Sequence, residues 1–189
     1  EQSHGQITTS SFTNSEGIQI EITEETKLTL NNCRIHHGNS NAIKASMNST
    51  LNIYDSQITD HRLPQIVIND SSLIFKNSEL LNGERNGFII ENYSEAFIQD
   101  SFISKHRYPQ IWIDKYSTVE MKTTTITEGK ESDIYVQNHS NLYADQCIIR
   151  NDNFKFNVQA VNNSKIDLTY SIVENKVGEQ FYIENNSFI

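Results

Sequence analysis

The stretch "NGFIIENYSEAFIQDSFI" (residues 86–103) contains the short apolar segments that decide the fold. It holds an alternating pair, Phe88 and Ile90, and two later apolar residues, Ala96 and Ile103, that each lie two residues after a serine. Alternation with a period of two over short segments is typical of half-buried β-strands. The stretch therefore predicts three short strands that are separated by tight turns.

The same pattern recurs through the whole chain. A serine or threonine, any residue and then an apolar residue reappear at steps of 23, 22, 23, 23, 23, 24 and 23 residues. The repeats begin at Thr26, Ser49, Ser71, Ser94, Ser117, Ser140, Ser164 and Ser187. A period this steady indicates a solenoid. We predict about eight coils of 22–24 residues, each with three short strands.

We call the strands of one predicted coil a, b and c. Strand a has the expected inward pairs Ile18 and Ile20, Ile66 and Ile68, Phe88 and Ile90, Ile111 and Ile113, Ile134 and Val136, Phe156 and Val158, and Phe181 and Ile183. Strand b follows the serine, with inward pairs such as Leu28 and Leu30, Leu51 and Ile53, and Leu73 and Phe75. Strand c begins with a small inward residue, namely Cys33, Ser56, Ser78, Ser101, Thr124, Cys147 or Ser171.

Two solenoids have this period. "LTLNNCRI" (residues 28–35) fits part of a leucine-rich repeat. That repeat needs another leucine three residues earlier, where this chain has polar residues such as Glu25, Asn48 and Asp70. It also needs a helical or turn segment where this chain has strand a. Both observations exclude the leucine-rich repeat and leave a parallel β-helix.

The pattern resembles the right-handed parallel β-helix of the pectin-lyase-like superfamily, and within it the generic repeat group. The resemblance rests on residues 86–103 and on "QIVINDSSLIFKNSEL" (residues 65–80), and it covers nearly the whole chain. It implies an all-β fold, with a ladder of asparagines along the turns at Asn69, Asn92, Asn138, Asn162 and Asn185. It implies no particular activity, because the sequence lacks the N-T-D, G-H-G, R-I-K and D-P-H-D motifs of the superfamily's enzymes.

Composition narrows the classes of partner. The net charge of −9 argues against nucleic acid and anionic membrane surfaces, and no apolar run has the length of a membrane span. Cys33 and Cys147 occupy one column five coils apart, roughly 24 Å at the coil spacing of a β-sheet. That separation excludes a disulfide and a shared metal site. Free buried thiols suit the cytoplasm and do not exclude an extracellular location, so the compartment stays open.

The chain is expected to form a single β-helix domain over residues 1–189. Because strand a begins close to the first residue and strand b is interrupted at Ile189, we expect it to be a fragment of a longer protein, with other domains of that chain as partners. No cofactor and no metal site are expected.

Strand a departs from the Ser, Thr and Asn background of the surface. Its central outward residues are expected to be Gln19, Lys44, Val67, Ile89, Trp112, Tyr135, Asn157 and Tyr182. Beside this apolar and aromatic stripe lie Glu91 and Asp114 on adjacent coils, and a column of Tyr93, Tyr116 and His139. Aromatic rings next to carboxylates are typical of a sugar-binding surface, and two adjacent carboxylates also suit glycoside hydrolysis.

The octets "HRLPQIVI" (residues 61–68) and "HRYPQIWI" (residues 106–113) lie 45 residues, or two coils, apart. The proline is expected to define the turn before an inward isoleucine. The repeat does not demand the His-Arg pair, because the intervening coil has "GERNG" (residues 83–87) there. We therefore expect two basic corners flanking the ligand surface, formed by His61, Arg62, His106, Arg107 and, beside them, Tyr108.

Three functions remain open. The first is a non-catalytic recognition or scaffold domain that binds a carbohydrate or protein partner through strand a and its turns. The second is a carbohydrate-active enzyme, a glycoside hydrolase or polysaccharide lyase, with Glu91 and Asp114 as the acid pair. The third is a structural spacer of a surface or phage-fibre protein.

Overall fold

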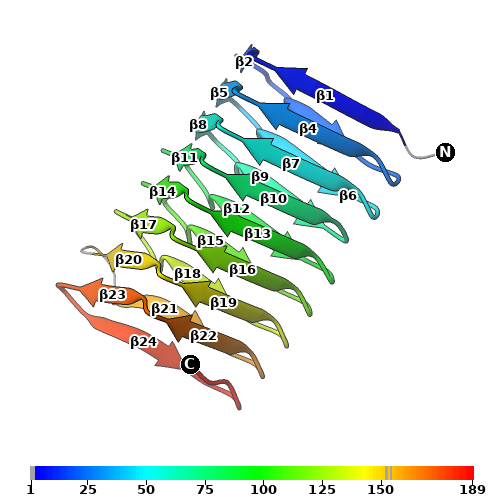
Figure 1. Cartoon of the computed structure of the whole chain (residues 1–189). Coiled ribbons are helices and arrows are strands. Elements are labelled where there is room, and N and C mark those ends of the chain that lie inside the picture. Colours follow the sequence, from blue (N-terminus) through cyan, green and yellow to red (C-terminus); the bar gives the residue numbers. More distant parts are fainter. Residues whose placement is uncertain (1–2, 152, 154) are drawn as a thin grey trace.

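The computed structural model describes residues 3–151, 153 and 155–189. In this part of the chain, three parallel sheets of eight strands each run side by side along one axis (Figure 1). Each coil contributes one strand to every sheet, so neighbouring strands of a sheet come from successive coils. The fold is the predicted all-β solenoid, with three short strands in each complete coil.

Sheet A corresponds to the predicted strand b and contains β1 (His4–Thr8), β4 (Lys27–Asn31), β7 (Thr50–Tyr54), β10 (Ser72–Lys76), β13 (Glu95–Gln99), β16 (Thr118–Lys122), β19 (Asn141–Asp145) and β22 (Lys165–Thr169). Sheet B corresponds to strand c and contains β2 (Ser11–Thr13), β5 (Arg34–Gly38), β8 (Gln57–His61), β11 (Glu79–Leu81), β14 (Phe102–Ser104), β17 (Thr125–Thr127), β20 (Ile148–Asn151) and β23 (Ile172–Asn175).

Sheet C corresponds to strand a and contains β3 (Ile20–Ile22), β6 (Ile43–Ser46), β9 (Ile66–Asn69), β12 (Phe88–Glu91), β15 (Ile111–Ile113), β18 (Ile134–Val136), β21 (Phe156–Ala160) and β24 (Glu179–Ile183). The strands β1 and β2 add sheet A and sheet B positions ahead of the first repeat that the sequence pattern detected.

The register confirms the predicted repeat, with two corrections in strand a. The first inward pair is Ile20 and Ile22 rather than Ile18 and Ile20, and in β21 Val158 and Ala160 point inward rather than Phe156 and Val158. In both coils a polar residue occupies an interior position just before the inward pair. The side-chain amide of Gln19 or Asn157 there donates to a backbone carbonyl across the turn. The expectation that Gln19 and Asn157 lie in the outward stripe is therefore wrong.

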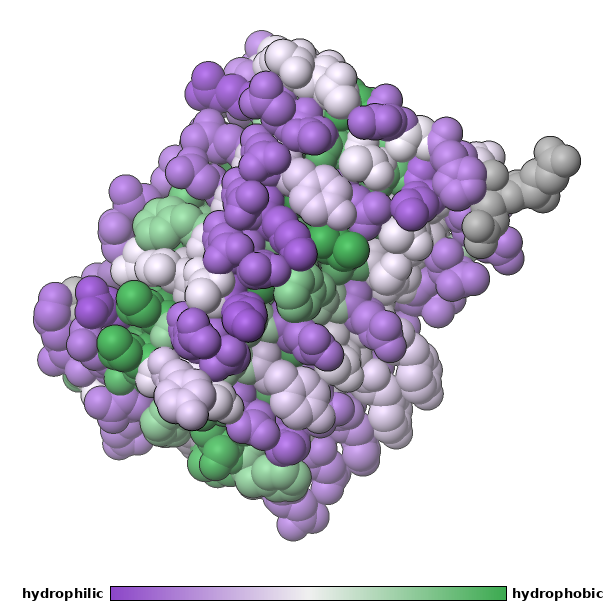
Figure 2. Space-filling view, viewed as in Figure 1, coloured by the Kyte–Doolittle hydropathy of each residue, from purple (hydrophilic) through white to green (hydrophobic). Residues whose placement is uncertain are grey.

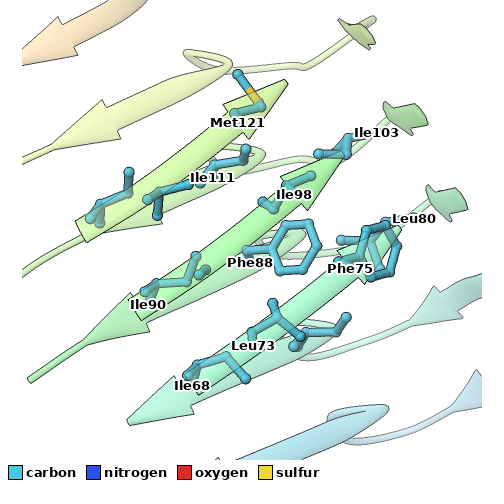
Figure 3. Close-up of a cluster of buried hydrophobic side chains, with 14 of the residues drawn as sticks. Ile68, Leu73, Phe75, Leu80, Phe88, Ile90, Ile98, Ile103, Ile111 and Met121 are labelled. Atoms are coloured by element: carbon cyan, nitrogen blue, oxygen red, sulfur yellow. The ribbon is translucent and has the colours of Figure 1, made fainter. Parts of the chain in front are cut away.

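The core is a continuous stack of aliphatic side chains along the axis (Figure 3). Phe75 of β10 and Phe88 of β12 are fully buried, and their rings meet edge to face with centroids 5.2 Å apart. Burying a side chain of this size stabilises the fold by about 1.5–3 kcal/mol. Sheets A and C are thus joined through their inward columns.

Sharp turns depend on left-handed backbone conformations and on small polar side chains. Pairs of consecutive residues with positive φ follow most sheet C strands, as at Asn138 and His139 (φ 54° and 65°). Asparagine tolerates this region better than most residues. The predicted asparagine ladder is present from Asn138 onward, since Asn162 donates to Asn138 and Asn185 donates to Asn162, at 3.2 and 3.0 Å.

A serine column lines the next corner. The backbone N–H of Ser71 donates to Oγ of Ser94, and the N–H of Ser94 donates to Oγ of Ser117, at 3.2 and 3.1 Å. The same contact links Cys147 to Ser171 in the second small-residue column. Buried backbone donors at the corners are satisfied in this way. Both cysteines are buried free thiols, as the sequence predicted.

The side that Figures 1 and 2 present, with sheet A toward the viewer, is mainly hydrophilic with scattered apolar side chains. In the part of the chain that the structure describes, no helix is long and apolar enough to span a membrane.

Candidate functional site

The outer face of sheet C carries the predicted aromatic stripe. The register aligns Val67, Ile89, Trp112 and Tyr135 in one column, each half-buried. The Trp112 and Tyr135 rings lie 5.0 Å apart, tilted by 36°. Successive coils place these rings side by side because parallel strands are separated by one sheet spacing. Gln159 follows Tyr135 in this column.

A polar column borders the aromatic pair. Glu91 accepts hydrogen bonds from Asn69 (3.1 Å) and Lys115 (3.2 Å), and its side chain is about a quarter exposed. Asp114 lies one coil further on, is only 8% exposed, and accepts a 2.7 Å bond from Asn138. The asparagine ladder therefore ends on the Asp114 carboxylate. Burial raises the pKa of Tyr135, and the carboxylates of Glu184 and Asp114 raise it further.

The turn that follows these strands presents an aromatic stack. Tyr93 and Tyr116 lie 5.2 Å apart with an interplanar angle of 5°, and His139 lies 4.9 Å beyond Tyr116 at 14°. Tyr93 is 71% exposed and Tyr116 is 51% exposed. The predicted column is confirmed. Its stacked rings cover one another's faces, so the stack offers polar edges to an outside partner.

The structure does not place the two histidines of the repeated octets on the surface. His61 and His106 are both fully buried. Their rings point into the coil, where Nε2 of His61 lies 2.8 Å from Oε1 of Gln19, and Nε2 of His106 lies 3.0 Å from Oε1 of Gln65. The expectation that they form basic corners on the ligand surface is wrong, because a buried ring cannot contact an outside partner.

The sequence did contain the signal for this interior site. Gly38, His61, Gly83, His106 and Gly129 occupy the same position in successive coils. A Cβ on Gly38 would lie 2.5 Å from the His61 ring, and a Cβ on Gly83 would lie 2.5 Å from the His106 ring. Each histidine therefore needs a glycine in the preceding coil. This alternation explains why the octet returns after two coils and not after one.

A second interior column alternates in step with the first. Gln19, Gln65 and Gln110 each donate from Nε2 to a backbone carbonyl of a sheet B strand, at 3.1, 2.7 and 2.9 Å. The intervening coils have Ala42 and Gly87 at this position, which leaves room for the imidazole rings. Each amide thus bridges sheet B to the start of sheet C.

Burial acts on the titratable groups of this interior. It lowers the pKa of His61 to about 4, because the imidazolium form loses its hydration. Desolvation also lowers the pKa of His106 to about 4 and raises that of Asp133 to about 7. The hydrogen bond that His106 makes to Oε1 of Gln110 and the one that Asp133 accepts from Nε2 of Gln110 oppose these shifts.

Arg62, Arg107 and Tyr108 lie on the surface, as expected. Arg62 pairs with Glu84 at 3.9 Å, and the Arg85 guanidinium lies 4.7 Å from the centre of the Tyr108 ring. Arg107 lines an open groove of about 720 Å³ at the turns between sheets B and C. Its other charged residues are Lys105, Lys130, Glu84 and Glu128.

The groove is locally basic. Lys105 pairs with Glu128 at 3.6 Å and Glu84 pairs with Arg62, while Arg107 and Lys130 add two further positive charges to its lining. Within the described residues, no group of three or more His, Cys, Asp or Glu side chains is arranged to hold a metal ion.

Three parallel sheets wound coil upon coil define a β-solenoid whose interior is filled and whose possible sites lie on its outer faces. The chain belongs to the right-handed β-helix family: the family model described as "right handed beta helix region" matches residues 1–74 and 64–189.

Among solved structures, a double mutant of the periplasmic alginate epimerase AlgG matches 96% of this chain at 12% identity, with a TM-score of 0.48. This chain spans 58% of the length of that one. A likeness at this level carries no argument about activity. Comparison with curated proteins gave no match.

Proposed function

We propose that this chain is a non-catalytic recognition domain that binds a polysaccharide across the outer face of sheet C. The observation that carries the proposal is the Trp112–Tyr135 pair on the outer face of sheet C. The turns that form the basic groove precede the sheet C strands, and the turns that carry Tyr93 and Tyr116 follow them. Aromatic side chains with a few placed polar groups are the usual lining of a carbohydrate or small-molecule site.

Each part of this surface has a chemical role. Trp112 and Tyr135 contribute apolar area against sugar rings, and the tyrosine hydroxyl groups can bond sugar hydroxyls. Arg107 offers a planar guanidinium that matches carboxylate groups with two parallel hydrogen bonds. The surface therefore favours an acidic polysaccharide.

The two carboxylates support binding better than catalysis. Glu91 is held by Lys115 and Asn69, and Asp114 is largely buried and held by Asn138. A general acid has to give its proton to a substrate oxygen within hydrogen-bond reach. These contacts occupy both groups from neighbouring coils and favour a role in shaping the face.

The test compares Trp112→Ala and Tyr135→Ala with Tyr143→Ala, which removes a similarly placed ring from the outer face of sheet A. Binding of the chain to a panel of neutral and acidic polysaccharides is measured by calorimetry. We expect the first two variants to weaken binding at least about tenfold, equivalent to 1.4 kcal/mol, and the control to leave it unchanged. Equal binding by all four proteins would overturn the proposal, as would a failure of the wild-type chain to bind any member.

A further inference from the structure

The interior between the third and sixth coils contains a titratable pair that the proposed binding surface does not use. His106 and Asp133 are both fully buried. Gln110 connects them, since its Oε1 lies 3.0 Å from Nδ1 of His106 and its Nε2 donates to Oδ1 of Asp133 at 2.8 Å. The three side chains form one hydrogen-bonded chain inside the coil.

The orientation of both glutamine amides beside His106 is determined by their other partners. Nε2 of Gln110 uses its two hydrogens on the carbonyl of Thr127 and the carboxyl group of Asp133. Nε2 of Gln65 donates to the carbonyl of Leu81. A carbonyl can only accept. Both glutamines therefore turn Oε1, an acceptor, toward His106.

His106 thus faces an acceptor at each ring nitrogen, with both distances at 3.0 Å. A neutral imidazole carries one N–H and can satisfy only one of them, whereas an imidazolium donates from both nitrogens. In the neutral form a lone pair would face an oxygen without a proton between them, and an unmade buried hydrogen bond is destabilising.

Asp133 has the complementary requirement. Its Oδ1 accepts a 2.8 Å hydrogen bond from Nε2 of Gln110. Its Oδ2 has no hydrogen-bond partner among the described atoms. Oδ2 is therefore unsatisfied in either form, and the bond donated by Gln110 to Oδ1 is the contact that suits the carboxylate.

We propose that His106 and Asp133 form a buried, charge-compensated pair, imidazolium and carboxylate, joined through the Gln110 amide, and that this pair is a pH-sensitive element of the solenoid. Desolvation of each group by itself favours the neutral forms, because it lowers the pKa of His106 and raises that of Asp133. The second acceptor at the His106 ring, Gln65, and the attraction between the two opposite charges favour the ionised forms, and in the proposed pair these interactions outweigh the desolvation. Loss of either charge leaves the other buried without a counter-ion. The pair therefore supports the fold in a window of pH around neutrality and weakens it on either side.

Among the described residues, neither His106 nor Asp133 forms an ion pair with another charged side chain. The His106 ring lies against Gly83, Gly87, Gln65 and Gln110, and none of these four residues titrates. Asp133 meets Gln110 and Gly129. The charged residues Glu84, Lys105, Arg107, Glu128 and Lys130 line the groove on the outside of the same turns.

The position of the pair gives it a consequence for the surface. Gln110 directly precedes β15, which carries Trp112, and Asp133 directly precedes β18, which carries Tyr135. A change of charge in the pair therefore acts on the starts of these two strands. The inference about the charge state itself does not depend on ligand binding.

The first octet supplies a control inside the same molecule. His61 has the same fold position as His106, but only its Nε2 has a partner, Gln19, and its Nδ1 has none among the described atoms. In the coil after Gln110 the equivalent residue is Asp133, whereas in the coil after Gln65 the equivalent residue is Gly87, which has no carboxyl group. His61 is therefore expected to be a neutral imidazole with its proton on Nε2.

The experiment is nuclear magnetic resonance of the chain labelled with ¹⁵N-histidine, in which two-bond correlations from the ring protons identify which nitrogens carry protons. Single His→Gln variants assign the signals. At pH 7 we expect His106 to be doubly protonated and His61 singly protonated. In Asp133→Asn, which keeps the shape and removes the charge, His106 should lose the doubly protonated state.

A singly protonated His106 in the wild type at pH 7 would overturn the proposal, because desolvation would then dominate. A doubly protonated His106 that persists in Asp133→Asn would remove Asp133 as the counter-ion and also overturn it. If Asp133→Asn does not fold, titration of the wild type decides: the proposal requires His106 to keep both protons throughout pH 5–8, while His61 keeps one at pH 7.

Discussion

At the scale of single residues, glycine and histidine alternate at the same interior position of successive coils. The ring of His106 occupies the space over Gly83, and the ring of His61 does the same over Gly38. A solenoid stacks equivalent residues one coil apart, so two large rings in adjacent coils would overlap. The repeated octet is therefore an architectural feature with a period of two coils, and its histidines belong to the core.

This alternation predicts the effect of a single methyl group. Gly83→Ala should lower the free energy of unfolding by about 1–3 kcal/mol, because the new Cβ overlaps the His106 ring and overpacking is costly. Gly17→Ala is the matched control, since its Cβ would meet nothing within 4 Å. Urea unfolding measures both. Adding His106→Ala to Gly83→Ala should recover part of the loss, and a purely additive double mutant would contradict the overlap.

At the scale of the elements, the turns after the sheet C strands are held by two separable features. Asn162 has a positive φ of 55°, and its amide both donates to Asn138 and accepts from Asn185. The first feature is a backbone preference, and the second is a hydrogen-bonded ladder between coils.

Two substitutions separate them. Asn162→Gly keeps the left-handed conformation and loses the ladder, at a cost of about 1–2 kcal/mol for two hydrogen bonds that are partly open to water. Asn162→Ala loses the ladder and also pays about 1–2 kcal/mol for the left-handed backbone. Thermal and urea unfolding should therefore rank wild type above Asn162→Gly and Asn162→Ala lowest. The reverse order of the two variants would contradict this account of the turn.

The contact between sheets A and C predicts a larger effect. Phe75→Ala should lower the free energy of unfolding by about 3–5 kcal/mol, because it leaves a cavity against Phe88 in a fully buried layer. Phe97→Ala on the outer face of sheet A is the control, since that ring is only half-buried. A similar loss in both variants, measured by urea unfolding, would show that the core contact has no special weight.

At the scale of the whole molecule, buried titratable groups link folding to pH. The pKa of His61 is about 4 in the folded chain and 6.5 without burial, so the unfolded chain binds a proton that the folded chain excludes. Its contribution to stability is complete above pH 6.5 and is lost as the pH falls toward 4.

Unfolding in urea at several values of pH checks this sign. Between pH 6.5 and pH 4, His61 should account for a loss of as much as about 3 kcal/mol. The variant His61→Gln should therefore show a flatter pH dependence over this range than the wild type. An equally steep dependence in both proteins would assign the loss to other groups.

The period of 22–24 residues and the two-residue alternation allowed the solenoid, its three strands and most of its inward residues to be predicted. Those features are local and repeat in every coil, so pairs such as Ile66 and Ile68 could be recognised without knowing their neighbours. The same reasoning predicted the half-exposed Trp112 and Tyr135 and the stack of Tyr93, Tyr116 and His139.

The two-residue alternation of apolar residues gave wrong predictions where polar side chains lie in the core. Gln19 and Asn157 have polar side chains, yet they point inward because a carbonyl across the turn accepts their amide hydrogens. His61 and His106 are polar and are each followed by an arginine, which led to the prediction that they lie on the surface. A glycine one coil away provides the space in which each ring is buried.

The sequence by itself thus determined the coil, because hydrophobic periodicity is a local property that each strand shows without its neighbours. Only the tertiary structure decided which polar residues lie inside, because that depends on the volume and the hydrogen-bonding groups of the coils above and below.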